Sequence, residues 1–281
     1  MDERTSTEVC YRHRDRPTGL HCSRCGKPIC SECSNDASVG QLCPDCAAPE
    51  GRHRVVQARS FWARPSFQTA PVSFSILGVT VAVFVLGALS PELDRWLFET
   101  FALIGPAVAA GEWWRIFTVA LLHGGIMHLA FNMYALYLFG PRLEQQVGSP
   151  SFLALYLASA AAGSAVSYLF GPPNLLAVGA SGAIFGLFGA WLFAFWKLRG
   201  TNRGANAMFN QLLVLLVINL VLPLLPGLNI DWRAHLGGLA AGILIAFLWS
   251  VLAAGRDNAV AIRTAIASMV AVVSVIVVLI A

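Results

Sequence analysis

The chain has 281 residues, of which 57% are hydrophobic and 12% are charged, and its mean hydropathy is +0.65. Because a soluble domain carries about 25% charged residues, this composition excludes a wholly soluble protein and indicates that most of the chain meets lipid. The net charge of +4 comes largely from arginine-rich stretches in the first 64 residues, which predicts a small polar head followed by a large membrane body.

All seven cysteines lie in the head, residues 1–48, where four pairs of metal-ligand residues share one spacing and read CYRH, CSRC, CSEC and CPDC. Each pair can occupy one edge of a tetrahedral zinc ion, so eight ligands suit two structural ions. Residues 1–60 lack the apolar core of a signal peptide, so we expect the head to stay cytosolic, where thiols remain reduced. The predicted ligands are Cys10, His13, Cys22, Cys25, Cys30, Cys33, Cys43 and Cys46.

The head resembles B-box and related cross-braced zinc fingers. The resemblance implies that the first and third pairs bind one ion and that the second and fourth pairs bind the other. The spacing alone also allows a sequential arrangement. A unit of this size cannot build a large apolar core, so metal removal should unfold it. We expect a protein-interaction or regulatory module, and no nucleic-acid partner, because aromatic residues interleaved with basic ones are missing.

After a basic juxtamembrane linker, residues 49–70, the chain is predicted to be all-α. A membrane helix needs about 20 apolar residues, and we count seven such stretches, the first six forming a core over 71–253 and the last following a loop within 254–281. Lysine and arginine number six in the predicted inside loops against three outside, so the N-terminus is predicted to be cytosolic and the C-terminus outside. We expect an integral multi-pass protein of a bacterial plasma membrane. The predicted spans are approximately 71–90, 116–139, 150–170, 178–196, 208–225, 234–253 and 263–281.

Polar residues inside spans are costly and are therefore functional candidates. Spans two, four and six run in the same direction, so their first halves lie at one depth. These halves contain His128 and Asn132, then Ser181, then His235. Glycines beside Ser181 and behind His235 allow spans four and six to approach closely. Such packing would bring the Ser181 hydroxyl within hydrogen-bond reach of the His235 imidazole.

This set of side chains suits acyl transfer. A neutral imidazole can accept the proton of an attacking serine. His128 and Asn132 are four residues apart and share a helix face; with the Ser181 backbone N–H at a helix start, they could stabilise an oxyanion. A lone serine or asparagine more often only ties helices together. Four such residues on three spans favour a site.

Five segments together resemble the rhomboid family of intramembrane serine proteases. The resemblance covers about residues 71–253. It implies a six-helix core, catalysis without a cofactor, Ser181 as nucleophile, His235 as general base and acid, and an oxyanion hole formed by His128, Asn132 and the Ser181 amide. The segments are EWWR at 112–115, HGGIMHLAFN at 123–132, GPRLE at 140–144, GASGAIFG at 179–186 and AHLGGLAAG at 234–242.

The resemblance also implies supporting roles. Trp114 and Arg115 are expected to be scaffold residues, an interfacial anchor and a snorkelling cation. Glu144 matches a buried structural carboxylate, and Phe185 stands where an aromatic ring packs against the catalytic histidine.

Two further residues carry expectations of their own. Asp231 lies four residues before His235 and is a candidate for the acid of a triad, but we expect a solvated loop residue instead, and the resemblance implies a dyad without an acid. His123 is expected to face the water-filled cavity as a supporting residue.

The sequence therefore predicts an intramembrane serine endopeptidase that cleaves peptide bonds in or near the transmembrane segments of single-span membrane proteins. The alternative is a non-catalytic rhomboid-like protein that binds client transmembrane helices. Inactive relatives usually lose the serine or the histidine, and this chain has both. A transporter would require charged residues in the spans or inverted repeats, and neither is visible.

Overall fold

The computed structural model describes residues 8–37, 40–47, 65–201, 203–222 and 230–281. The chain divides into two compact units, Met1–Arg64 and Pro65–Ala281, and each is described by itself. Residues 49–64 of the predicted basic linker lie outside the described residues, as does His53.

The described part of the first unit consists of short elements. They are the 3-10 helix η1 (Ser31–Cys33), the antiparallel strands β1 (Asn35–Asp36) and β2 (Gln41–Leu42), and the helix α1 (Pro44–Ala47). Its buried apolar cluster contains Ile29 together with five cysteines. Cysteine side chains thus form most of a core that larger apolar side chains form in a bigger domain. A core this small does not stabilise the fold alone, and bound metal ions are one way to supply the missing stability.

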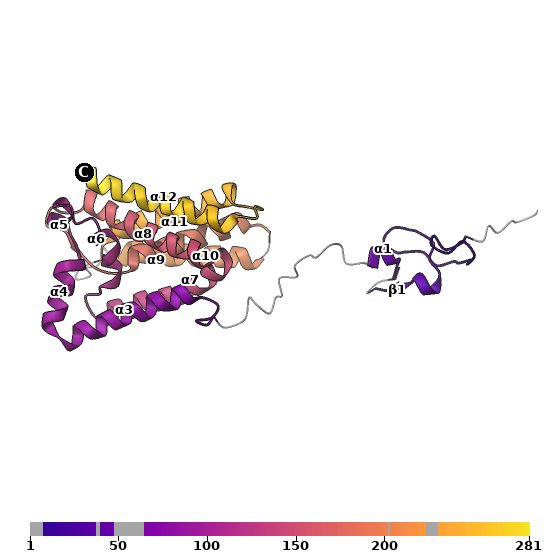
Figure 1. The fold of residues 1–281 in the computed structure, drawn as a ribbon, viewed down its shortest axis with the longest axis horizontal. Coiled ribbons are helices and arrows are strands. Elements are labelled where there is room, and N and C mark those ends of the chain that lie inside the picture. The colour runs from indigo at the N-terminus through magenta and orange to yellow at the C-terminus, as the bar shows by residue number, and fades with distance from the viewer. Residues whose placement is uncertain (1–7, 38–39, 48–64, 202, 223–229) are drawn as a thin grey trace, which may run out of the picture. The chain divides into compact units, whose positions relative to one another are not determined.

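The second unit is all-α apart from one two-stranded ribbon, as the sequence predicts (Figure 1). Among its described residues, five helices are long and apolar enough to cross a membrane, and a bent helix pair would make a sixth candidate. The five are α3 (Pro71–Leu89), α8 (Ser149–Phe170), α9 (Ser181–Leu198), α11 (Trp232–Leu252) and α12 (Ala259–Ile280).

The predicted span 208–225 corresponds to α10 (Arg203–Val221), which is not among these candidates. Residues 223–225 of that prediction lie outside the described residues. The structure therefore supports five or six of the seven predicted spans.

The predicted span over 116–139 is not one continuous helix. The segment begins as α6 (Arg115–Thr118) and the 3-10 helix η2 (Val119–Leu121), breaks, and turns by 99° into α7 (Ile126–Val147). The break coincides with Gly124 and Gly125, and glycine is a poor helix former. As a consequence, His128 lies in the first turn of α7.

The loop between α3 and α6 is structured. It contains α4 (Pro91–Phe101), β3 (Leu103–Ile104) and α5 (Gly105–Ala109). The Ser90 hydroxyl caps α4 by accepting a hydrogen bond from the Leu93 N–H at 3.2 Å, a common N-cap interaction. Strand β3 pairs with β4 (Leu176–Ala177), so this loop is tied to the segment that leads into α9.

Arg115 holds the same loop from inside. Its side chain is 5% exposed, and it donates to the Ala102 carbonyl at 2.8 Å and to the Glu99 carbonyl at 2.6 Å. The scaffold role predicted for Arg115 agrees with these bonds, but the snorkelling conformation is wrong. These carbonyls and the Glu112 carboxylate, which accepts from Arg115 Nε at 2.7 Å, hold the guanidinium inside the loop.

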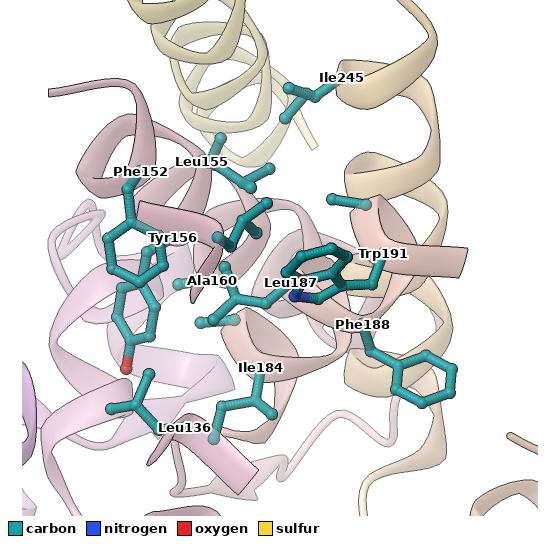
Figure 2. Close-up of a cluster of buried hydrophobic side chains, with 14 of the residues drawn as sticks. Leu136, Phe152, Leu155, Tyr156, Ala160, Ile184, Leu187, Phe188, Trp191 and Ile245 are labelled. Carbon is teal, nitrogen blue, oxygen red and sulfur yellow. The ribbon is translucent and has the colours of Figure 1, made fainter. Parts of the chain in front are cut away.

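The central core lies between α7, α8, α9 and α11. Figure 2 shows Leu136 of α7, Phe152 and Leu155 of α8, Leu187 of α9 and Ile245 of α11 pointing into one cluster, and all five are fully buried. Helix α12 runs along α8 on the side of the bundle away from α3 (Figure 1).

A buried carboxylate joins three helices. Glu144 is 1% exposed, and it accepts hydrogen bonds from the backbone N–H groups of Val72 and Ser73 in α3 at 3.0 and 2.7 Å. It also accepts from the hydroxyls of Ser73 and Ser149 at 2.7 and 2.6 Å. Glu144 thus satisfies the orphan donors at the start of α3 and contacts the first residue of α8, which confirms its predicted structural role.

Candidate active site and metal centres

Ser181 is the first residue of α9, and its side chain is half-buried. The preceding Gly179 has φ +129°, a conformation that favours glycine, and its N–H donates to the Val119 carbonyl at 3.0 Å. A side chain at Gly179 would lie 2.8 Å from the His128 ring and 3.8 Å from Ser181 Oγ. Because Gly179 has no side chain, the His128 ring can lie against its backbone, close to Ser181.

Helices α9 and α11 pack with their backbones in contact. A methyl group at Gly238 would overlap the Gly182 carbonyl, and one at Gly242 would overlap the Gly186 carbonyl. The third helix, α8, joins at Gly163, where a methyl group would lie 2.7 Å from the Ala234 carbonyl. This close approach, predicted from the glycine stripes, places the start of α9 beside the start of α11.

His235 is 7% exposed and lies in the first turn of α11. The Phe185 ring stacks on its imidazole, with ring centroids 4.1 Å apart and planes 12° apart. The predicted aromatic contact is therefore confirmed.

Ser181 and His235 make no side-chain hydrogen bond with each other in the described part of the chain, and His235 Nδ1 is buried without a partner. Catalytic hydrogen bonds are often long in a substrate-free enzyme and shorten when substrate binds.

The expectation that Asp231 is a solvated loop residue is wrong. Asp231 is the half-buried N-cap of α11, and its carboxylate accepts a hydrogen bond from the Ala234 N–H at 3.2 Å. The Ser167 hydroxyl of α8 donates to the other carboxylate oxygen. The signal for this role was an aspartate directly before a helical segment.

His128 and Asn132 lie on successive turns of α7, and the Asn132 side-chain amide donates to the His128 carbonyl at 2.9 Å. Asn132 is buried and His128 is half-buried. An amide nitrogen carries two hydrogens, so one donor of Asn132 is left for another acceptor.

His123 does not face an open cavity as expected. It is 4% exposed, its ring nitrogens lack hydrogen-bond partners among the described residues, and its ring packs edge-on against His128 at 5.0 Å.

A small cavity of about 20 Å³ lies against Ser181. Residues from β3, η2, α8, β4, α9 and the start of α11 line it, including Ser164, Gly179 and Asp231. Its size corresponds to about one water molecule. The site is thus a narrow, partly polar space between helix starts.

The first unit contains two groups of metal-ligand atoms, each within 4.8 Å of one another. The grouping follows the cross-braced order, and the sequential arrangement is not formed. The groups are Cys10, His13, Cys30 and Cys33, and Cys22, Cys25, Cys43 and Cys46.

These residues fit a tetrahedral ion. His13 Nδ1 lies 3.4 Å from the sulfurs of Cys30 and Cys33, and the Cys25 and Cys43 sulfurs are 3.7 Å apart. With Zn–S bonds of about 2.3 Å, the edges of a tetrahedron are about 3.8 Å. The contact with Cys43 is the largest cause that raises the pKa of Cys46, to about 12. A divalent cation would offset this crowding of thiolates.

The remaining histidine of the described part of this unit, His21, is exposed and contacts Glu8.

The second unit is similar in sequence to known proteins. The Rhomboid domain model matches residues 110–252, about half of the chain. The YdcA protein of Bacillus subtilis (strain 168) is 41% identical over 178 residues, which cover 63% of this chain and 88% of the relative. Rhomboid protease GluP of the same organism is 36% identical over 185 residues, which cover 64% of this chain and 35% of that protein. RHOMBOID-like protein 1 of Arabidopsis thaliana is 39% identical over 140 residues, half of this chain and 35% of the relative.

Proposed function

The chain belongs to the rhomboid family, and from this premise we propose that it is an intramembrane serine endopeptidase. The observation that carries the proposal is the contact between the starts of α9 and α11 at Gly182 and Gly238, which brings the segments of Ser181 and His235 together. Its substrates would be other membrane proteins, cleaved in or near a transmembrane segment. The apolar helices of this multi-pass protein and its family membership support a reaction within the bilayer.

In the first half of the reaction, Ser181 Oγ attacks the carbonyl carbon of the scissile bond while His235 accepts the hydroxyl proton. The carbonyl π electrons move to the oxygen, and the resulting oxyanion faces the Ser181 N–H at the positive end of α9. His128 and Asn132 supply the further donors. His235 then gives its proton to the leaving nitrogen as the C–N bond breaks, which leaves an acyl ester on Ser181.

In the second half, a water molecule attacks the ester, and His235 accepts a proton from it. Collapse of the second oxyanion breaks the bond to Ser181, and His235 returns the proton to Oγ. The free carboxylic acid leaves and the enzyme is restored. His235 serves as base and acid in turn, and no cofactor takes part in these steps.

The test is cleavage of a single-span model substrate in proteoliposomes. We expect cleavage by the natural protein and none by Ser181→Ala or His235→Ala, because either change removes a member of the dyad. Ser274→Ala is a matched control, since Ser274 lies on α12 and bonds the carbonyl of its own helix at Val270. It should cleave normally.

A serine-directed fluorophosphonate distinguishes the remaining outcomes. Labelling of Ser181 without cleavage would mean that the model substrate is unsuitable. Absence of both labelling and cleavage in a folded natural protein would contradict the proposal and favour a rhomboid-like protein that only binds client helices.

For the first unit, we propose two structural zinc ions, one in each ligand group. The Cys₃His and Cys₄ donor sets support zinc, which such closed sites bind without an open coordination position. The unit would lie in the cytosol of a bacterial cell and bind a protein partner, with the C-terminus on the other side of the plasma membrane. This orientation is supported by the excess of arginine and lysine in the loops predicted to lie on the cytosolic side.

A further inference from the structure

A carboxylate, that of Asp231, lies at the start of α11, and a Ser–His dyad does not by itself require one. Asp231 caps the helix, accepts a hydrogen bond from Ser167 of the neighbouring α8, and lines the cavity that also contacts Ser181. Its own carbonyl accepts the N–H of His235 at 3.2 Å, so the two residues lie one helical turn apart. Asp231 is the sole carboxylate among the described residues that line this cavity.

The electrostatic setting of His235 disfavours a cation. Helix starts carry a partial positive charge, and two of them meet here, that of α9 at Ser181 and that of α11 at Trp232. This field suits an oxyanion. It opposes the imidazolium that must form when His235 accepts the proton of Ser181.

Among the described residues, no carboxylate forms an ion pair with the imidazole. His235 is 7% exposed, and its Nδ1 is buried without a hydrogen-bond partner in the described chain. Phe185 covers one face of the ring. A charge that forms on this ring is therefore poorly solvated, and buried charges need a partner.

We propose that Asp231 is a positioning residue of the reaction, whose negative charge at the start of α11 stabilises the protonated state of His235. The proposal rests on the function proposed above. Asp231 touches neither the substrate nor the reacting atoms in this role. Ser167 holds the carboxylate in place, so α8 takes part through this hydrogen bond.

The other charged and titratable groups near the ring do not supply this charge. His128 on α7 can only be neutral or positive. His123, beside His128, has the same limitation. On α11 itself, the Arg233 guanidinium lies over the Trp232 ring at 4.8 Å and is a further cation. From α9, the described neighbours Ser181 and Phe185 are uncharged near neutral pH.

The test compares Asp231→Asn with the natural full-length protein in proteoliposomes. Asparagine caps a helix about as well as aspartate, so the fold and the start of α11 should be retained while the charge is lost. We expect kcat to fall about tenfold and the acidic limb of the pH–activity profile to move about 1 pH unit lower, as for loss of a close opposite charge. KM should change less than about twofold, because no substrate contact is removed.

Three further variants separate the effect of the charge from an effect on the structure. Asp257→Asn removes an exposed carboxylate beyond the other end of α11 and should leave the pH limb unchanged. Ser167→Ala keeps the charge but frees the carboxylate, so it should give a smaller shift in the same direction. Asp231→Glu should restore part of the kcat lost in Asp231→Asn.

A folded Asp231→Asn protein with the natural pH profile would overturn the inference, whether or not kcat falls, because a loss of rate without a shifted limb indicates a structural role only. If the natural protein neither cleaves nor reacts with the fluorophosphonate, the proposed function fails and the inference falls with it. Cleavage by the natural protein together with an unshifted Asp231→Asn limb would contradict the inference alone.

Discussion

The Phe185 ring lies parallel to the His235 imidazole, with centroids 4.1 Å apart and planes 12° apart. Phe185 lies one helical turn after Ser181 on α9, and the stack joins this turn to α11. It therefore fixes the orientation of the imidazole ring relative to the segment that contains Ser181. Aromatic pairs of this kind contribute about 1 kcal/mol beyond the area they bury.

We therefore expect Phe185→Leu to lower kcat about tenfold through a less ordered imidazole, while Phe185→Tyr keeps most of the activity. Phe193 is the control, because it lies on the same helix and packs on Trp196 and Phe247 instead. The test measures the cleavage rate and the thermal unfolding temperature of Phe185→Leu and of Phe193→Leu, and we expect a large loss of rate only in Phe185→Leu. Equal losses in both variants would show that the effect is one of stability.

The glycine contact between α9 and α11 gives a second prediction. Gly238→Ala should abolish cleavage and lower stability, since the methyl group would overlap the Gly182 carbonyl and force the two helices apart. Gly78→Ala is the matched control. Nothing lies within 4 Å of a methyl group at Gly78 in α3, so helix propensity should leave that variant unchanged or slightly more stable. A fully active Gly238→Ala protein would contradict the packing described above.

Glu144 gives a third prediction, on stability. Glutamine at this position would replace one carboxylate oxygen by an NH₂ group, which is a donor and cannot accept a hydrogen bond. One of the backbone N–H groups of Val72 and Ser73 would then be buried without an acceptor. We expect Glu144→Gln to lower the free energy of unfolding by about 2 to 3 kcal/mol. The change is measured by unfolding in detergent, with the exposed Glu92→Gln as the comparison. Losses of similar size in the two variants would argue against the buried network.

Metal analysis of the full-length protein gives a fourth prediction. Two zinc ions per chain are expected, and Cys30→Ser and Cys43→Ser should each retain one, because the two ligand groups share no residue. Chelation should expose residues 8–47 to limited proteolysis, since that unit has only a small apolar cluster of its own. A single ion in the natural protein, or loss of both ions in each variant, would contradict two independent sites.

The structure also shows where sequence reasoning stops. Runs of apolar residues predict helices reliably, but not whether such a run is straight, and the predicted span over 116–139 turns by 99°. The deciding feature is the pair Gly124 and Gly125, whose low helix propensity competes with the apolar pattern on either side. Similarly, the pattern of Cys and His residues predicted the eight ligands, and the resemblance to cross-braced fingers implied the observed grouping, but the spacing alone left the sequential arrangement open, because the grouping depends on how the chain folds back on itself.

By itself, the sequence determined that this is a membrane protein whose head contains eight potential metal ligands, which residues could carry the chemistry, and which glycines allow helices to approach. These properties follow from composition and from spacing along one chain. Only the tertiary structure decided that Asp231 is a half-buried cap bonded to Ser167, that Arg115 lies inside a loop, and that His123 packs against His128. Each of these depends on distances between segments far apart in sequence, and local periodicity carries no information about such distances.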